Sequence, residues 1–310
     1  KNRSLTKRIL ASRGLVETVS YSFISDKYAK FFNHMNESLV LLNPISSELN
    51  ILRQSLLPNL ISSTKKNSDK GIKDISLFEV SHCFNGVGIS DQFDSAAGVR
   101  LGRAIGLGGA EDWRGRGRDI NIYDAKEDVL VVLRAFGIKD DKYKITQDTP
   151  DYYHPGKSGV IRQGPQNIIA YFGEIHPKIL KGFDIEESLC CFEIFMDNFS
   201  NNKKKKTRGR DGYYSSQFMP ISRDFAFIFD KDINAEDILQ SIKRIKNTMI
   251  ENVKIFDVYT GKNIPENKKS IGINVTIQPH EKTLTDKEIE EISNMIIMEI
   301  SNKFGAEIRA

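Results

Sequence analysis

Cysteine is scarce in this sequence, and long hydrophobic runs are missing. The three cysteines are Cys83, Cys190 and Cys191, which neither form an even set for disulfides nor have the spacing of a metal site. No segment approaches the roughly 18 uncharged apolar residues that a membrane helix needs, and no secretory signal opens the chain. These absences argue against a disulfide-rich scaffold and a membrane protein. They predict a cytoplasmic protein without a metal site, whose cysteines are small buried hydrophobic residues.

A strong overall charge is also absent. The net charge is +4 in 310 residues, with 39% hydrophobic and 28% charged residues. These values are typical of an ordinary globular protein, and the length suffices for two domains. Because the first residue is Lys1 rather than methionine, we expect a fragment of a longer protein.

The excess positive charge is concentrated in one short run. Residues 203–210 carry a net charge of +6, whereas residues 214–310 hold 13 basic and 15 acidic residues, a net charge of −2. We predict a first domain at 1–200, a basic linker at 201–213 and a second domain at 214–310. The basic run is interpreted as a solvated linker or, alternatively, as a sequence-independent contact with phosphates.

Hydrophobic patterning in residues 214–310 predicts the order strand–helix–strand–strand–helix–strand. This order is the split βαβ plan of ferredoxin-like domains. In the third strand, apolar residues at 271, 273, 275 and 277 alternate with Gly272, Asn274, Thr276 and Gln278, which indicates one apolar and one polar face. Thr285, three residues before Glu288, predicts an N-terminal capping box for the second helix.

The polar face of this predicted sheet suits contact with RNA, because single-stranded bases are recognised by stacking and by hydrogen bonds to their edges. We expect a stacking residue, three residues that read base edges, and two arginines that bind phosphates from the same face. In that order, these residues are Tyr259, then Asn274, Thr276 and Gln278, then Arg223 and Arg309. At each position, an ordinary solvent-exposed strand residue is the alternative. The net charge of −2 predicts weak binding by this domain alone.

The first 200 residues predict an antiparallel sheet flanked by helices, because long helices do not regularly separate the strands. The expected strands cover residues 16–23, 38–42, 72–80, 99–107, 143–147, 158–163, 167–173 and 189–196, and the expected helices residues 5–13, 55–66 and 125–136. His154 and His176 each precede a proline, and we interpret them as hydrogen-bonded turn histidines rather than as bases.

Ten sequence blocks, in order, resemble one known family. In the first half they are Leu42–Ser46, Leu52–Pro58, Leu77–Val80, Tyr153–Gly156 and Phe172–Pro177; in the second they are Arg223–Phe227, Phe256–Gly261, Lys268–Ser270, Thr283–Asp286 and Gly305–Arg309. Together they resemble the C-terminal part of the bacterial phenylalanyl-tRNA synthetase beta subunit. Ser81, Lys157 and Gly159 are mild departures from that family's usual residues.

The resemblance implies an α+β fold: a catalytically silent, class II synthetase-like antiparallel sheet domain, then a ferredoxin-like βαββαβ anticodon-binding domain. It implies a phenylalanine–tRNA ligase that works as an α₂β₂ heterotetramer in the cytoplasm, with an alpha subunit and tRNA(Phe) as partners. ATP and Mg²⁺ serve the whole enzyme, and the fragment itself is expected to hold no cofactor. No catalytic residue is assigned to it.

Two arginines bind the nucleotide in class II synthetases, where they neutralise developing phosphate charge. The corresponding stretches, residues 78–84 and 171–177, contain no arginine. We therefore predict that this chain alone does not form an adenylate. The alternatives are a complete single-chain synthetase of the organellar type, which would be active alone, and a free-standing RNA-binding module.

Overall fold

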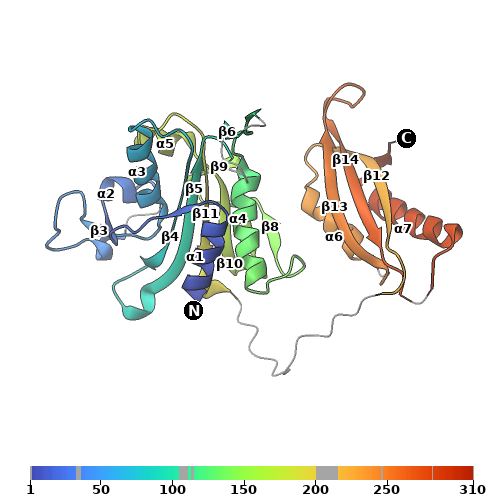
Figure 1. Cartoon of the computed structure of the whole chain (residues 1–310), viewed down its shortest axis with the longest axis horizontal. Coiled ribbons are helices and arrows are strands. Elements are labelled where there is room, and N and C mark those ends of the chain that lie inside the picture. The colour runs from blue at the N-terminus through green and yellow to red at the C-terminus, as the bar shows by residue number, and fades with distance from the viewer. Residues whose placement is uncertain are drawn as a thin grey trace. The chain divides into compact units, whose positions relative to one another are not determined.

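The computed structural model describes residues 2–32, 36–104, 111–112, 115–199, 216–245, 247–280 and 282–309, without the side chains of 111–112 and 115–116. The chain divides into two compact units, Lys1–Lys205 and Lys206–Ala310 (Figure 1). The predicted linker at 201–213, with its basic run at 203–210, lies outside the described residues.

The first unit is built on a seven-stranded sheet (Figure 1). In spatial order its strands are β1 (Val16–Glu17), β4 (Ile75–Phe84), β5 (Gln92–Leu101), β11 (Leu189–Phe195), β10 (Ile168–Ile175), β9 (Tyr153–Arg162) and β8 (Lys144–Thr146). Only the β1–β4 pair in this sheet is parallel, so the predicted antiparallel sheet is confirmed. The small pairs β2 (Phe23–Ile24) with β3 (Ile51–Leu52), and β6 (Glu111–Asp112) with β7 (Gly115–Arg116), lie outside it.

Helices cover both faces of this sheet. Helices α1 (Asn2–Ser12) and α4 (Ile122–Ala135) pack on one core, and α3 (Leu57–Ser68) and α5 (Pro177–Gly182) pack on the other. Strand β11 supplies Cys191 to the α3 side and Cys190 to the α4 side. A strand covered on both faces reads as a continuous apolar run, which is how this strand appears in the sequence. The three cysteines are free and buried, as predicted, and burial raises the pKa of the Cys190 thiol to about 12.

Three predicted strands of the first unit are wrong in whole or in part. Residues 38–42 do not form a strand; a 3₁₀ turn, η1 (Glu37–Leu39), forms instead because Asn36 Oδ1 accepts the Ser38 N–H at 3.1 Å. Residues 16–23 divide into β1 and β2 with an irregular segment between them. The strand expected at 99–107 ends at Leu101, where Gly102 turns the chain with φ of +83°.

Strand β5 also begins earlier than expected, because it forms a hairpin with the end of β4 after the turn η2 (Ile89–Asp91). The remaining elements are the short helix α2 (Asp26–Ala29), which follows β2, and the turn η3 (Met196–Asn198), which follows β11. The helices expected at 5–13, 55–66 and 125–136 are present as α1, α3 and α4, within a few residues of the predicted bounds.

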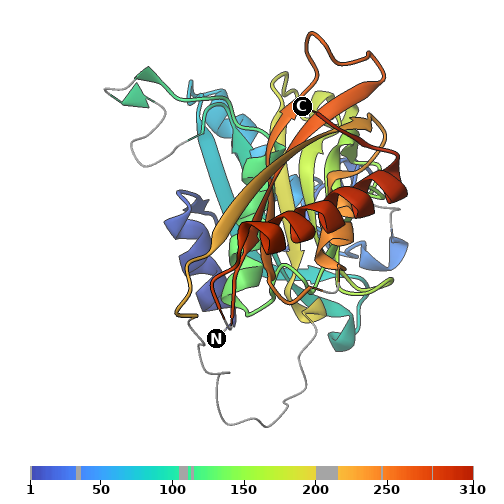
Figure 2. The same ribbon diagram turned by 90° about the vertical axis from the view of Figure 1, so that its right-hand side faces the viewer.

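The second unit has the predicted element order. Its antiparallel sheet has the spatial order β13 (Ile250–Tyr259), β14 (Lys268–Ile277), β12 (Ile221–Asp230) and β15 (Glu307–Ile308). The helices α6 (Ala235–Lys243) and α7 (Asp286–Phe304) pack on one face of it, and Figure 2 shows α7 as the long red helix across the orange strands. The capping box of Thr285 and Glu288 is present, as predicted.

A bilayer-spanning helix would need a long apolar stretch, and none of the helices in the described part of the chain has one.

Candidate nucleic-acid interface

The sheet of the second unit leaves one face without helices. Strand β14 pairs with β12 so that Asn274 lies opposite Asp224 and Thr276 lies opposite Ser222. Directly opposite residues of an antiparallel pair project to the same side of the sheet, and successive residues alternate. Because Ile273 and Val275 are buried under the helices, Asn274 and Thr276 lie on the open face, where the alternation predicted them.

Tyr259 and Arg309 meet over the same face. Tyr259 lies opposite Ser270, which has the same strand phase as Asn274. The Arg309 guanidinium carbon lies 5.4 Å from the centre of the Tyr259 ring, within the range of a cation–π contact. The Arg309 backbone N–H donates to Ala226 O at 2.7 Å, which fixes the chain after β15. Residues from the two opposite edges of the sheet therefore converge on one surface.

Phe256 is a third member of this surface that the sequence reasoning missed. The β13–β14 register shifts between Ile255 and Asp257, so Phe256 is the extra residue of a bulge, and it is 60% exposed. A Cβ atom added at Gly272 would come within 2.8 Å of Phe256 Cζ, so the ring rests on glycine backbone. The one available signal was Gly272 itself, because glycine inside a strand often marks a bulge or a close approach.

The two amide side chains are held by neighbouring groups. Asn274 Nδ2 donates to Ser222 Oγ at 2.7 Å and to Asp224 Oδ1 at 2.6 Å. Gln278 lies just beyond β14, and its Nε2 donates to the backbone oxygens of Phe218 at 2.9 Å and Pro279 at 3.1 Å. These hydrogen bonds orient both amides, and for Gln278 they tie down the segment that leads into β12.

Arg223 does not share the open face with Arg309, so that expectation is wrong. Arg223 lies opposite Val275, which is fully buried on the helix side. Its side chain also projects to the same face of the strand as those of Phe225 and Phe227, both of which belong to the core. Arg223 is nevertheless exposed. The sequence already indicates this placement, because residues two apart in a strand, such as Arg223 and Phe225, project to the same face of the sheet.

The buried arginines of the first unit are bound by carboxylates. Arg53 is fully buried, and its Nη1 donates to Glu79 Oε1 at 2.9 Å. Arg100 donates to both oxygens of Asp128, from Nε at 2.6 Å and from Nη2 at 2.9 Å. The guanidinium groups inside this unit are therefore engaged in internal ion pairs.

The two turn histidines are structural, as predicted. His154 Nδ1 accepts the Gly156 N–H, and His176 Nδ1 accepts the Lys178 N–H at the start of α5, both at 3.1 Å. Within the described ranges there is no group of three or more His, Cys, Asp or Glu residues arranged to hold a metal ion.

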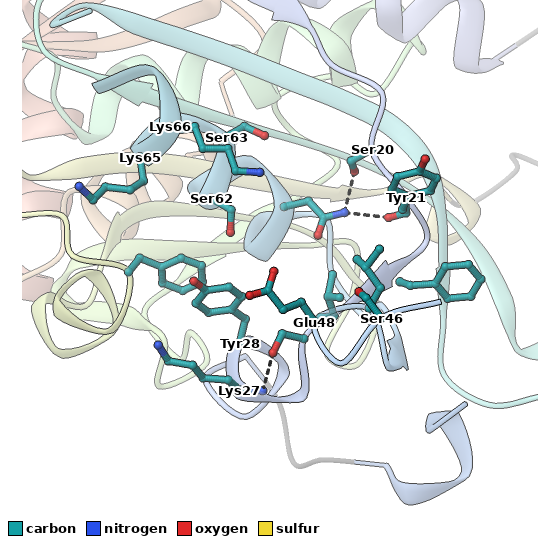
Figure 3. Close-up of a pocket in the computed structure, with 16 residues that line it drawn as sticks. Ser20, Tyr21, Lys27, Tyr28, Ser46, Glu48, Ser62, Ser63, Lys65 and Lys66 are labelled. Carbon is teal, nitrogen blue, oxygen red and sulfur yellow. Dashed lines mark hydrogen bonds between the residues drawn. The ribbon is translucent and has the colours of Figure 1, made fainter. Parts of the chain in front are cut away.

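A cavity of about 550 Å³ opens beside α3 in the first unit (Figure 3). Lys65 and Lys66 of α3 and Tyr28 of α2 lie around it with Glu48. Asn59 Nδ2 holds the segment before β2 by donating to Ser20 Oγ at 2.6 Å and to Tyr21 O at 2.8 Å.

Exposed apolar side chains gather in the two segments beside this cavity. Val19 is 89% and Leu42 98% exposed, and Tyr21 and Ile45 are also exposed. The segments are joined through the β2–β3 pair and a bridge between Val40 and Ile51.

Comparison with known families matches both units. Residues 1–196 match the phenylalanyl tRNA synthetase beta chain CLM domain, and residues 216–309 match the ferredoxin-fold anticodon binding domain. The chain belongs to the phenylalanyl-tRNA synthetase beta chain family. The predicted resemblance is thus confirmed, and the open face described above belongs to the family's anticodon-binding domain.

Relatives in this family cover nearly the whole chain. The phenylalanine–tRNA ligase beta subunit of Bradyrhizobium diazoefficiens is 43% identical over 304 residues, and that of Rhodopseudomonas palustris is 42% identical. Each alignment covers 98% of this chain but 38% of the relative, so the chain spans well under half the length of these subunits.

Among solved structures, the pyrrolysyl-tRNA synthetase of Desulfitobacterium hafniense is 18% identical, with a TM-score of 0.47. The match covers 63% of this chain and 66% of that one. A likeness at this level supports no conclusion about fold or activity.

Proposed function

We propose that this chain is a non-catalytic part of a phenylalanine–tRNA ligase beta subunit. Its second unit binds the anticodon region of tRNA(Phe), and its first unit supports the catalytic alpha subunit. The complete enzyme is a class II synthetase, an α₂β₂ heterotetramer of the cytoplasm that uses ATP and Mg²⁺ to join phenylalanine to its tRNA. On this proposal, the first unit has a class II-like fold but does not catalyse adenylate formation.

The observation that carries the RNA-binding part is the open face with Phe256, Tyr259 and Arg309. Aromatic rings provide stacking surfaces for unpaired bases, and a guanidinium beside them binds phosphate or stacks in turn. The hydrogen bonds that orient Asn274 leave its amide oxygen to accept from a base edge. Thr276, on the same face, adds a hydroxyl that both donates and accepts.

The charge of the second unit sets the expected strength of binding. A net charge of −2 in residues 214–310 provides little counterion release, which supplies most non-specific affinity for nucleic acid. Binding by this unit is therefore weak alone and becomes effective when the rest of the enzyme positions the tRNA. Affinity tighter than about 1 μM for the isolated unit at physiological salt would contradict this account.

The scaffold part of the proposal is supported by two features of the first unit. The exposed apolar residues at Val19, Tyr21, Leu42 and Ile45 offer a surface on which a protein partner buries apolar area. The buried arginines have carboxylate partners, and the sequence has no arginine at 78–84 or 171–177. A nucleotide would therefore lack the charge clamps that adenylation requires.

Two assays test this proposal. The chain is titrated with tRNA(Phe) transcript and with a transcript of the same fold whose anticodon loop has been replaced, and preferential binding of the first is expected. ATP–pyrophosphate exchange with phenylalanine is then measured for the chain alone and for the chain assembled with an alpha subunit. Exchange by the chain alone would favour a single-chain synthetase, and equal binding of both transcripts would contradict anticodon recognition.

A further inference from the structure

A second cavity in the first unit, of about 370 Å³, lies on the α3 side of the sheet. Rings from three neighbouring strands form one wall: Phe93 of β5, Phe195 of β11 and Tyr171 of β10. The Phe195 ring centre lies 6.2 Å from that of Phe93 and 5.4 Å from that of Tyr171, and the Tyr171 contact is edge-on. This wall suits an apolar or aromatic group, and its ring faces also favour a positive charge.

A buried carboxylate, that of Glu193, also lines the cavity. Glu193 is 2% exposed, and its oxygens accept hydrogen bonds from Ser55 Oγ at 2.5 Å and Tyr152 Oη at 2.9 Å, with Tyr153 Oη at 3.4 Å. Within the described part of the chain, no Lys, Arg or His nitrogen lies within 4.0 Å of this carboxylate. Burial raises the pKa of Glu193, as expected for an acid without a cationic partner.

A neighbouring acid provides the contrast. Ala97 of β5 lies opposite Glu79 on one side and Glu193 on the other, so the two carboxylates occupy one row on the same face. Glu79 is paired with Arg53 at 2.9 Å, whereas Glu193 has only neutral donors. The sheet therefore holds one buried acid that is paired with an arginine, Glu79, and one that is hydrogen-bonded by neutral donors and borders a cavity, Glu193.

The remaining lining residues indicate which ligand charge the cavity favours. A second carboxylate, Asp197, lies at the cavity, together with the amides of Gln54, Asn85 and Asn198. Among the described residues that line it, there is no lysine, arginine or histidine. A ligand carboxylate or phosphate would therefore meet two acids at the lining, Glu193 and Asp197, whereas an ammonium group would be attracted by both.

We propose that this cavity binds a small primary amine with an apolar or aromatic body. The ammonium group binds at Glu193, and the body packs against Phe93, Tyr171 and Phe195. The volume is within the range of ordinary small-molecule sites, which run from about 300 to 1,000 Å³. A zwitterionic amino acid binds less well, because its carboxylate finds no partner. This inference does not depend on the function proposed above.

Three ligands of nearly the same shape and different charge test the proposal on the full chain at neutral pH. Phenethylamine is a cation, phenylalanine a zwitterion and 3-phenylpropionate an anion. Binding is followed by ligand-observed NMR and calorimetry. We expect phenethylamine to bind at least about tenfold more tightly than phenylalanine, and 3-phenylpropionate not to saturate below about 10 mM. Equal binding of the three, tighter binding of phenylalanine, or no binding of the amine up to about 10 mM would overturn the proposal.

A matched pair of variants assigns the site. Glu193→Gln removes the charge and keeps the shape, and it should weaken phenethylamine binding by about tenfold or more. Glu174→Gln makes the same change on β10, where Glu174 lies opposite Cys190 on the other face of the sheet, and should leave binding unchanged. Equal effects of the two variants would contradict the assignment.

A third variant covers the case in which Glu193→Gln does not fold. Tyr171→Leu keeps an apolar side chain and removes one ring, and it should weaken phenethylamine by about threefold to tenfold, the value of one aromatic contact. It should affect a non-aromatic amine such as butylamine less. The charge series on the unaltered chain decides the proposal in either case.

Discussion

The two units of this chain bury different kinds of residues. Inside the first unit lie the charged side chains Arg53, Glu79, Arg100, Asp128 and Glu193, whereas the buried polar residues of the described second unit are two serines, Ser241 and Ser270. The second unit instead buries apolar and aromatic side chains under its helices and leaves Phe256, Tyr259, Asn274 and Thr276 on the open face of its sheet. In the first unit, Arg53 and Arg100 pair with Glu79 and Asp128 in the interior, whereas the charged side chains of the described second unit lie outside its core.

Breaking a buried ion pair should give the largest difference in stability between the two units. Arg53→Met leaves Glu79 buried without its cation, which typically costs about 3–5 kcal/mol. We expect the first unit to lose that much stability, measured by hydrogen exchange on peptides from each unit, while the second unit keeps its protection. Arg134→Met is the control: its pair with Glu127 is exposed and should contribute less than about 1 kcal/mol. Equal losses in the two variants would contradict the contrast.

Removing a stacking ring should affect binding rather than stability. Phe256→Ala and Tyr259→Ala should each weaken binding of the anticodon stem-loop by about 1–3 kcal/mol, the value of one base–aromatic stack. Met298→Ala, at an exposed position on α7, is the matched control and should leave the affinity unchanged. Fluorescence anisotropy with a labelled stem-loop measures all three. A loss at Met298 as large as that at Phe256 would place the RNA on the helix side.

Glu193 should make the stability of the first unit depend on pH in the range above about pH 5. The folded-state pKa of Glu193 is raised above its usual value of 4.5, so the folded state binds more protons than the unfolded state once the pH exceeds that value. The stability contributed by this group is therefore lost as the pH rises toward the folded pKa, by up to about 1.4 kcal/mol per pH unit. Urea unfolding of the chain and of Glu193→Gln between about pH 5 and 8 should give diverging curves, with the variant less sensitive. Parallel curves of stability against pH for the chain and for Glu193→Gln would contradict this prediction.

The smallest effect concerns Arg223 and Arg309 of the second unit. Arg309→Gln removes the cation beside Tyr259 and should cost about 1 kcal/mol or more in stem-loop binding, with a shallower salt dependence. Arg223→Gln, on the helix side of the sheet, should change binding by less than about 0.5 kcal/mol. Titrations at two salt concentrations separate the variants. The reverse order would restore Arg223 to the RNA-binding face.

Much of the second unit could be predicted because its signals are local. Strand alternation around Ile273 and the capping box at Thr285 each depend on residues a few positions apart, and both are present in the structure. The exposure of Phe256 depends on a bulge against a partner strand, and its only trace in the sequence was Gly272. The phase of Arg223 follows from its position two residues before the buried Phe225 in the same strand.

The first unit was harder because its decisive contacts join distant residues. The pairing of Ser55 with Glu193 spans 138 positions and that of Arg100 with Asp128 spans 28, and no local pattern marks either. Residues 38–42 looked like a strand because Val40 to Leu42 are apolar, yet Leu42 is almost fully exposed and only Val40 forms a bridge. Apolar residues that serve a surface rather than a core mislead a reading based on burial.

The most direct test of the division between the two units is Tyr259→Ala in the assembled enzyme, assayed for two reactions at once. We predict that the KM for tRNA(Phe) in aminoacylation rises by about tenfold, while phenylalanine-dependent ATP–pyrophosphate exchange is unchanged. An unchanged KM, or an equal fall in both reactions, would contradict the account.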